Sequence, residues 1–136
     1  MLKGIGIDTA SISRIRKMTD TLSEGALSRL FTEAELKASR ERHDPAEYLA
    51  ARFAAKEAVF KAVAHLTPSK TFDLRLVETM NDETGCPYIA VSDRLREVFA
   101  SAGVASVMIS ITTEADTATA IAAAVGPADP AGPAGS

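Results

Sequence analysis

The sequence predicts a single α+β domain in which an antiparallel sheet packs on a long central helix. A chain of 136 residues is long enough for one hydrophobic core and too short for two. Residues 45–64 carry a continuous helical pattern, whereas residues 104–112 and 118–125 are rich in β-branched and small side chains. The short break between these two runs is typical of a hairpin, in which neighbouring strands are antiparallel.

The first third of the chain is predicted to form one strand and short helices. Residues 2–8 form an apolar run, which indicates a strand. The helical spacing of residues 11–22 places three apolar side chains on the inner side: Ile12, Ile15 and Leu22. Residues 24–31 are long enough for a further helical turn or two.

Two capping signals mark the next helices. The run Thr32-Glu33-Ala34-Glu35 is a capping box, which predicts a helix from about Glu33 to Arg40. Asp44 followed by Pro45 supplies an N-cap and a proline at the first helical position. We therefore expect the long helix to begin there and to continue to about Ala64.

The second half of the chain is predicted to contain mainly strands. Apolar residues alternate with polar ones at Phe72, Leu74 and Leu76, which predicts a strand with one buried face. Residues 81–85 are predicted to form a turn, and residues 88–91 the returning strand.

One more helix and a hairpin complete the prediction. Ser92 caps a helix that ends at Gly103, and its inner side chains include Leu95, Val98 and Phe99. Residues 114–116 then connect the two final strands. We expect residues 1–125 to form the domain and residues 126–136, almost all Gly, Pro and Ala, to form a disordered tail.

Composition excludes several classes of protein. Cys86 is the only cysteine, so no intrachain disulfide is possible and a reducing compartment is expected. There is no apolar run of transmembrane length, and residues 1–3 lead directly into a strand without the features of a signal peptide. We expect a cytoplasmic protein with no membrane partner. The net charge of −3 gives no indication of nucleic-acid binding.

The most informative segment is Arg52-Phe53-Ala54-Ala55-Lys56-Glu57-Ala58-Val59-Phe60-Lys61. It places Glu57 beside an apolar helix stripe formed by Leu49, Phe53, Phe60 and Val63. Lys61 lies one turn further on and reaches the same space. Small residues flank Glu57 and leave room for a metal or phosphate: Ala50, Ala54 and Ala64. The competing interpretation is an ordinary Glu–Lys pair on a half-exposed helix.

A second acid stands at the start of the chain. Gly4-Ile5-Gly6-Ile7-Asp8 is predicted to be a strand that ends in an aspartate and is followed by a helix. An acid at that place can point into a cleft beside the helix. The alternative is that Asp8 or Thr9 caps the following helix.

Together these two segments resemble the 4′-phosphopantetheinyl transferases, specifically the holo-acyl-carrier-protein synthase group. The family patterns are G-I/V-G-I/V-D and R-F/W-A-A-K-E-A-x-x-K, and both are matched in full. Three further segments resemble family patterns: residues 30–35 the F-T-x-x-E segment, residues 47–51 the E-x-L-A-A segment, and residues 81–87 the N-x-x-G-x-P turn. The resemblance covers nearly all of the chain except its tail.

The resemblance implies transfer of 4′-phosphopantetheine from coenzyme A to a serine of an acyl carrier protein. It assigns Asp8 and Glu57 to a Mg²⁺ ion, Lys61 to the phosphates, and Lys56 to a contact with coenzyme A. Arg52, Gly85 and Pro87 occupy further coenzyme A-binding positions of the matched motifs. The serine belongs to the partner, and its general base is either Glu57 or a water bound to the metal. His43 and His65 are expected on the surface, and Cys86 has no base at a recognisable spacing.

A short basic cluster, Arg14, Arg16 and Lys17, follows the first strand. It is either a solvated helix face or a docking surface for an acidic partner. Acyl carrier proteins are strongly acidic, and the resemblance implies that Arg14 contacts the carrier protein. It also implies a homotrimer with each active site in a cleft between neighbouring subunits.

The sequence departs from the family pattern at three places. Ser11 stands where the family has an acid, residues 63–66 lack the glycine of a G-T-G-type loop, and Thr113 stands where a histidine is expected. We interpret these changes as divergence in substrate handling, towards the carrier protein of a specialised pathway such as polyketide synthesis. The alternative is a slow or inactive relative that binds a carrier protein or coenzyme A without transfer.

Overall fold

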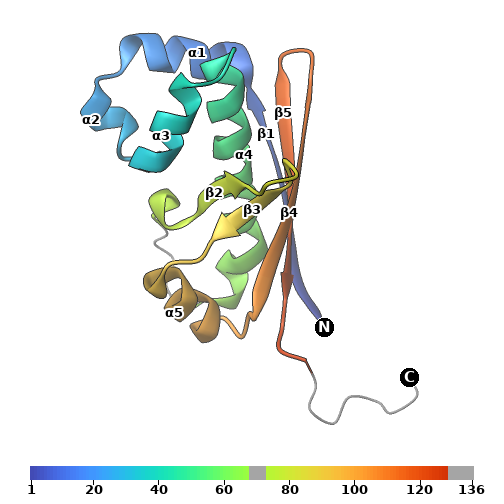
Figure 1. Ribbon diagram of the computed structural model, residues 1–136. Helices are drawn as coiled ribbons and strands as arrows, with labels where there is room; N and C mark the ends of the chain where they lie inside the picture. The colour runs from blue at the N-terminus through green and yellow to red at the C-terminus, as the bar shows by residue number, and fades with distance from the viewer. Residues whose placement is uncertain (68–72, 129–136) are drawn as a thin grey trace.

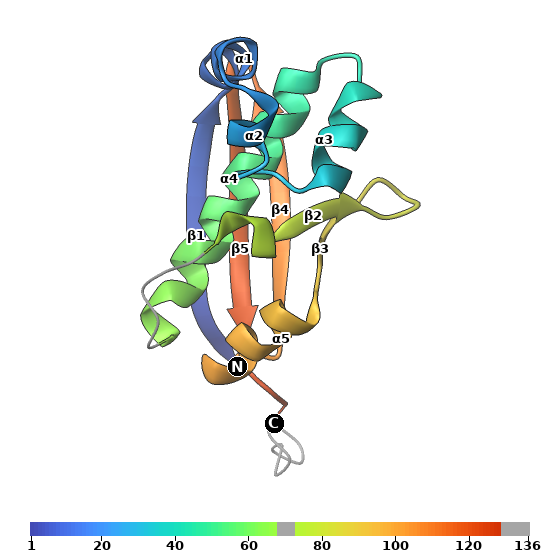
Figure 2. The same cartoon turned by 90° about the vertical axis from the view of Figure 1, so that its left-hand side faces the viewer.

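In the computed structural model, helices cover one face of a three-stranded antiparallel sheet (Figure 1). The structure describes residues 1–67 and 73–128. The strand order is β1 (Leu2–Ser11), β5 (Thr117–Val125) and β4 (Ser106–Glu114), so the central strand is the last in the chain. The helix α4 (Pro45–Val63) runs along the inner face of the sheet (Figure 2). The predicted fold class is confirmed.

The helix α4 begins and ends close to its predicted limits. The Asp44 side chain accepts a hydrogen bond from Glu47 N, and Pro45 takes the first turn. Most of α4 is buried on all sides, because the sheet lies on one side of it and the α1, α3 and β2 segments lie on the other. Within the predicted apolar stripe, Leu49 and Val63 are buried, whereas Phe53 and Phe60 are only partly buried.

Strand β1 and helix α4 approach each other unusually closely. A Cβ added at Gly4 would lie 2.0 Å from the Ala62 carbonyl oxygen, and one at Gly6 would lie 1.9 Å from that of Ala58. Only glycine fits at these positions, since any side chain would overlap the helix backbone. Ala58 and Ala62 of α4 lie at these contacts and are fully buried. Ala50 and Ala54 are fully buried, so the expectation that they leave room for a ligand is wrong.

Three short helices precede α4 in the chain: α1 (Ile12–Thr21), α2 (Glu24–Leu27) and α3 (Glu33–Arg40). Of these, α1 and α3 pack against α4. The predicted capping box is confirmed, because Thr32 and Glu35 exchange hydrogen bonds with each other's backbone N–H. Ile12 and Ile15 are buried as predicted. Leu22 lies beyond the end of α1 and is exposed, so its inward placement is wrong.

The segment after α4 differs from the prediction. The 3₁₀ turn η1 (Ala64–Leu66) extends α4, and a second 3₁₀ turn, η2 (Leu74–Leu76), replaces part of the predicted strand. The Asp73 side chain accepts from Arg75 N, which caps this turn and competes with strand pairing. Phe72 lies outside the described residues.

The remaining elements follow the prediction closely. The strands β2 (Glu78–Asn81) and β3 (Pro87–Ala90) flank the expected turn as a separate two-stranded sheet. The helix α5 (Asp93–Ser101) is capped by Ser92, with Leu95 and Phe99 buried and Val98 partly buried. Gly103 follows in the left-handed region at φ +70°, which allows the chain to leave the helix.

The β4–β5 hairpin forms as predicted, and its turn also fastens α1. Asp116 accepts hydrogen bonds from Ser13 N, Ser13 Oγ and Ser11 Oγ, and its carbonyl accepts from Ile12 N. These bonds satisfy free N–H groups at the start of α1. Within residues 1–67 and 73–128, the longest helix still falls short of the apolar length needed to cross a membrane.

Candidate active site

Asp8 and Lys61 meet where β1 packs on α4. Lys61 Nζ donates to Asp8 Oδ1 at 2.9 Å and to the Ile7 carbonyl oxygen at 3.2 Å. Asp8 is on the inner face of β1 and its side chain is only 18% exposed, whereas that of Lys61 is 50% exposed. The strand continues past Asp8 to Ser11, which itself caps α1. The alternative that Asp8 or Thr9 caps the helix is therefore wrong.

Glu57 lies one helical turn before Lys61 and shares this site. Burial raises the pKa of the Glu57 carboxyl, the charge of Asp8 raises it further, and the Lys61 ammonium lowers it. The hydrogen bond to Asp8 in turn raises the pKa of Lys61. Two carboxylates and one ammonium, from segments far apart in the sequence, thus form one electrostatically coupled group.

Lys56 does not belong to this group. Its side chain is fully buried and forms an ion pair with the equally buried Glu35, at 2.7 Å from Nζ to Oε1. Lys56 Nζ also donates to the Leu74 and Val77 carbonyl oxygens, at 3.1 and 2.8 Å. With no exposed surface and its donors already bonded, Lys56 cannot reach coenzyme A, so the assignment of Lys56 to that ligand is corrected. It holds the segment before β2 against α4.

Arg52 lies on the same side of α4 as Lys56 but in a different environment. It is 3% exposed, donates from Nη2 to Asn81 Oδ1 at 2.9 Å, and stacks 4.2 Å from the centre of the Tyr48 ring. Within the described part of the chain, no carboxylate forms an ion pair with Arg52, and its Nε has no hydrogen-bond partner. A buried cation without a counter-charge is costly, which indicates a place for an anion.

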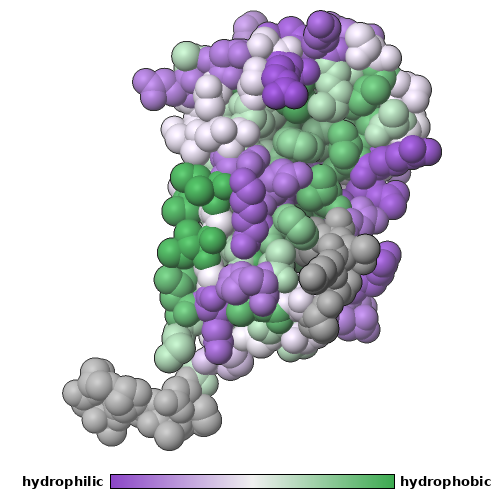
Figure 3. All heavy atoms as spheres, turned by 180° about the vertical axis from the view of Figure 1, so that it is seen from behind, coloured by the Kyte–Doolittle hydropathy of each residue, from purple (hydrophilic) through white to green (hydrophobic). Residues whose placement is uncertain are grey.

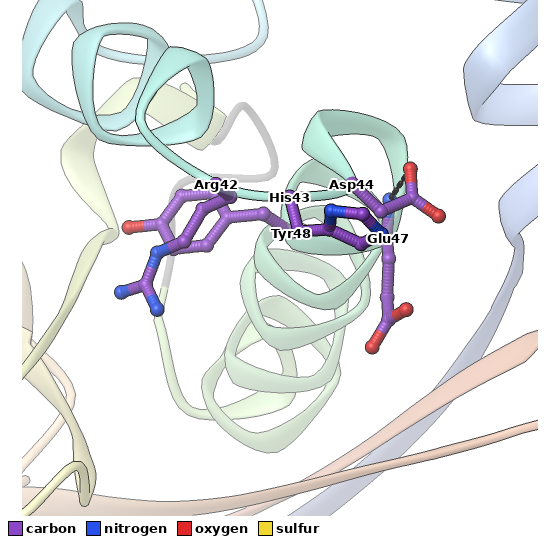
Figure 4. Close-up of a pocket in the computed structure, with 5 residues that line it drawn as sticks. All are labelled: Arg42, His43, Asp44, Glu47 and Tyr48. Atoms are coloured by element: carbon purple, nitrogen blue, oxygen red, sulfur yellow. Dashed lines mark hydrogen bonds between the residues drawn. The ribbon is translucent and has the colours of Figure 1, made fainter.

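A cavity of about 410 Å³ opens beside Tyr48 at the start of α4. Its lining residues are Arg42, His43, Asp44, Glu47 and Tyr48 (Figure 4). The guanidinium of Arg42 lies 4.9 Å from the Tyr48 ring, so this ring contacts two arginines. Neither Tyr48 nor Arg42 was predicted to be a site residue. The (i, i+4) spacing of Tyr48 and Arg52 was the available signal.

Gly85 and Pro87 lie in the β2–β3 hairpin. Gly85 adopts φ +86° with open space around it, and Pro87 begins β3 opposite Asn81. The Asp82 carboxylate accepts from Thr84 N and Cys86 N, which shapes the turn. The bond from Arg52 to Asn81 ties this hairpin to α4.

The basic cluster on α1 offers less outward positive charge than its sequence indicates. Arg16 forms an ion pair with Asp44 at 2.7 Å, and the Arg16 guanidinium lowers the pKa of that carboxyl. Arg14 and Lys17 are both exposed. The outward positive charge of α1 thus rests mainly on these two residues.

Two of the three departures from the family pattern, Ser11 and Thr113, make local hydrogen bonds. Ser11 caps α1 by accepting from Arg14 N, and it donates to Asp116. Thr113 Oγ1 donates to Glu47 Oε1 at 3.3 Å, next to the Tyr48 cavity. His43 and His65 are exposed, as predicted.

Comparisons with known proteins agree with this arrangement. The family model of the 4′-phosphopantetheinyl transferase superfamily matches residues 4–122. The holo-[acyl-carrier-protein] synthase of Desulforudis audaxviator is 41% identical over 129 residues, which is 95% of this chain and 97% of that protein.

Solved structures give the same result. The holo-[acyl-carrier-protein] synthase of Neisseria meningitidis matches with a TM-score of 0.80 and 31% identity, over 91% of this chain and 98% of that one. The Bacillus anthracis synthase in complex with CoA (3′,5′-ADP) matches with a TM-score of 0.74 and 30% identity, over 93% and 99% of the two chains. The chain therefore belongs to the 4′-phosphopantetheinyl transferase superfamily, in its holo-acyl-carrier-protein synthase group.

Proposed function

We propose that the protein transfers 4′-phosphopantetheine from coenzyme A to a serine of an apo-acyl carrier protein. The observation that carries the proposal is the meeting of Asp8, Glu57 and Lys61 at the β1–α4 contact. In the reaction, the serine oxygen bonds to the pantetheine-bearing phosphorus of coenzyme A, and the bond from that phosphorus to the bridging oxygen breaks. Adenosine 3′,5′-bisphosphate leaves with the electron pair, and the serine proton goes to a base.

The carboxylates of Asp8 and Glu57 fit a Mg²⁺ ion. Burial and the neighbouring Asp8 charge both raise the pKa of the Glu57 carboxyl, so a cation between the two carboxylates is favourable. No larger metal-ligating cluster occurs among residues 1–67 and 73–128, and Mg²⁺ needs only one or two carboxylates besides phosphate oxygens and waters. Bound there, the ion would neutralise the pyrophosphate and the leaving group. Lys61 would add a positive charge for the phosphates.

Coenzyme A is proposed to lie between α4 and the β2–β3 hairpin. Arg52 provides a buried positive charge for a phosphate, and the Tyr48 cavity lies next to it. Gly85 and Pro87 present the hairpin turn to the same ligand, and the open space around Gly85 allows a close approach. Arg42, on the other side of the Tyr48 contact, is a further candidate for the ligand's anionic groups.

Carrier-protein docking is assigned to α1, chiefly to Arg14 and Lys17, with Arg16 partly neutralised by Asp44. Arg14→Glu should raise the KM for the carrier protein at least tenfold and leave the KM for coenzyme A unchanged. Lys37→Glu is the matched control, because Lys37 is an exposed lysine on α3. Equal changes in both KM values for Arg14→Glu would contradict the assignment.

A homotrimer is proposed from the resemblance and from the outer face of the sheet. Four large apolar side chains on that face are between 45% and 64% exposed: Ile5, Ile7, Met108 and Ile121. Hydrophobic atoms gather along the edge of the molecule where the sheet lies (Figure 3). An exposed apolar surface of this kind favours burial against other subunits.

The proposed reaction is tested by intact mass. The protein is mixed with coenzyme A, Mg²⁺ and a panel of apo-carrier proteins, and the carrier is weighed for one added phosphopantetheine group. We expect transfer that EDTA abolishes, and its loss in Asp8→Ala and Glu57→Ala. No mass gain with any carrier, despite binding of coenzyme A, would favour the inactive relative and make Ser11, His65 and Thr113 the residues to examine.

A further inference from the structure

The Asp8 carboxylate already has a cation in contact with it. Lys61 Nζ lies 2.9 Å from Asp8 Oδ1 and is also held by the Ile7 carbonyl at 3.2 Å. With the Asp8 side chain only 18% exposed, few directions remain from which a second cation can reach that carboxylate. The Lys61 ammonium therefore occupies space beside Asp8 that a metal bound to this carboxylate would need.

We propose that Lys61 and the divalent cation compete for Asp8, so that metal binding releases the Lys61 ammonium towards the phosphates of coenzyme A. This inference rests on the proposed function, which assigns the metal to Asp8 and Glu57. It gives Lys61 a second role, because the same side chain that assists transfer also lowers the affinity of the site for its metal.

Electrostatics and chain flexibility support this role. An ammonium and a divalent cation in contact with one carboxylate repel each other over a short distance. Lysine has a flexible four-carbon stem and a compact charge, and the Lys61 side chain is half-exposed. It can leave Asp8 by rotating its own side chain, without any movement of α4. Asp8 is the more constrained partner, since it lies on the inner face of β1.

Competition predicts opposite effects on two measurable quantities. Removing the ammonium should tighten metal binding, because Asp8 no longer exchanges one cation for another. The same change should lower kcat, because the phosphates lose a positive charge. A residue with a merely structural role would weaken both, or change neither.

The test measures Mn²⁺ binding to the full chain without coenzyme A, by the electron paramagnetic resonance signal of free Mn²⁺. Mn²⁺ takes the same oxygen ligands as Mg²⁺. We expect Lys61→Gln to lower the Kd for Mn²⁺ about twofold to fivefold, the range that loss of a partly exposed ion pair allows. Lys61→Arg keeps the charge and should leave the Kd near that of the wild type. Lys3→Gln is the control for net charge, because Lys3 is an exposed lysine on β1, the strand that carries Asp8.

The outcomes separate this inference from the proposed function. An unchanged or higher Kd for Lys61→Gln would overturn the competition, as would equal tightening by Lys3→Gln. If Asp8→Asn and Glu57→Gln both bound Mn²⁺ like the wild type, the metal assignment itself would fail. Tighter Mn²⁺ binding together with a lower kcat in Lys61→Gln, and weak binding in Asp8→Asn, would support both proposals.

Discussion

Replacing Gly6 with alanine would test whether the close packing of β1 on α4 sets the geometry of the active site. The new Cβ would lie 1.9 Å from the Ala58 carbonyl oxygen, whereas ordinary contacts begin near 3.4 Å. The strand and the helix must therefore separate by roughly 1.5 Å along that line. Asp8 lies two residues further along the same face of β1, so such a movement would carry its carboxylate away from Glu57 and Lys61 on α4.

The expected loss is mainly in catalysis. A misplacement of about 1 Å can cost about 100-fold in rate, whereas overpacking costs about 1–3 kcal/mol in the free energy of unfolding. We expect Gly6→Ala to fold, as judged by urea unfolding, and to lose about 100-fold in kcat/KM in the mass assay. Gly4→Ala introduces a similar overlap, at 2.0 Å from the Ala62 oxygen, but further from Asp8. It should lose similar stability and less activity.

Gly25→Ala is the matched control, because its Cβ would lie 3.9 Å from the nearest atom, Ser23 Oγ. This variant should transfer phosphopantetheine at the wild-type rate. A folded Gly6→Ala variant with wild-type kcat/KM would refute the reasoning, since it would show that the site tolerates separation of β1 from α4.

Three further predictions concern other parts of the molecule. Lys56→Met leaves the Glu35 charge buried without a partner and should cost about 3–5 kcal/mol in urea unfolding. Adding Glu35→Gln removes that charge but keeps a side-chain oxygen for Thr32 N or Thr79 N, so it should recover part of that loss and leave the KM for coenzyme A near the wild-type value. Because the pKa of Glu57 is raised in the folded state, its contribution to stability is present below its usual value of 4.5 and is lost as the pH rises through the raised pKa. Glu57→Gln should therefore raise the melting temperature at pH 7 and not below about pH 4, while transfer is abolished. Ile7→Asp should dissociate the proposed homotrimer in light scattering and leave the far-ultraviolet circular dichroism unchanged.

Local signals in the sequence predicted most of the fold. The caps at Asp44, Thr32 and Ser92 each act within a few residues, so the helices that follow them begin where the prediction placed them. The wrong prediction at residues 74–76 has a non-local cause in addition to the local cap at Asp73. Lys56, far away in the sequence, takes the carbonyl oxygens of Leu74 and Val77 and holds that segment out of the sheet.

Local signals in the sequence also predicted part of the site. Glu57 and Lys61 share one helix, so their proximity follows from helical spacing alone. The contact of Asp8 with Lys61 depends on tertiary packing, and only the resemblance to a family linked the two segments. The role of Lys56 was missed because its partner, Glu35, lies on α3, and no periodicity relates the two residues.

The segment Gly4-Ile5-Gly6-Ile7-Asp8 combines three physical requirements that alternate along one strand. The glycines face inward and let α4 approach to a distance that no side chain would permit. Asp8 faces inward as well, and this close approach brings Lys61 within hydrogen-bonding distance of it. The isoleucines face outward and are more than half exposed. Since side chains alternate between the two faces of a strand, a one-residue shift of β1 would lose the close packing, the site and the apolar outer face together. The geometry of the site and the proposed assembly of subunits thus depend on the same register of β1 against β5.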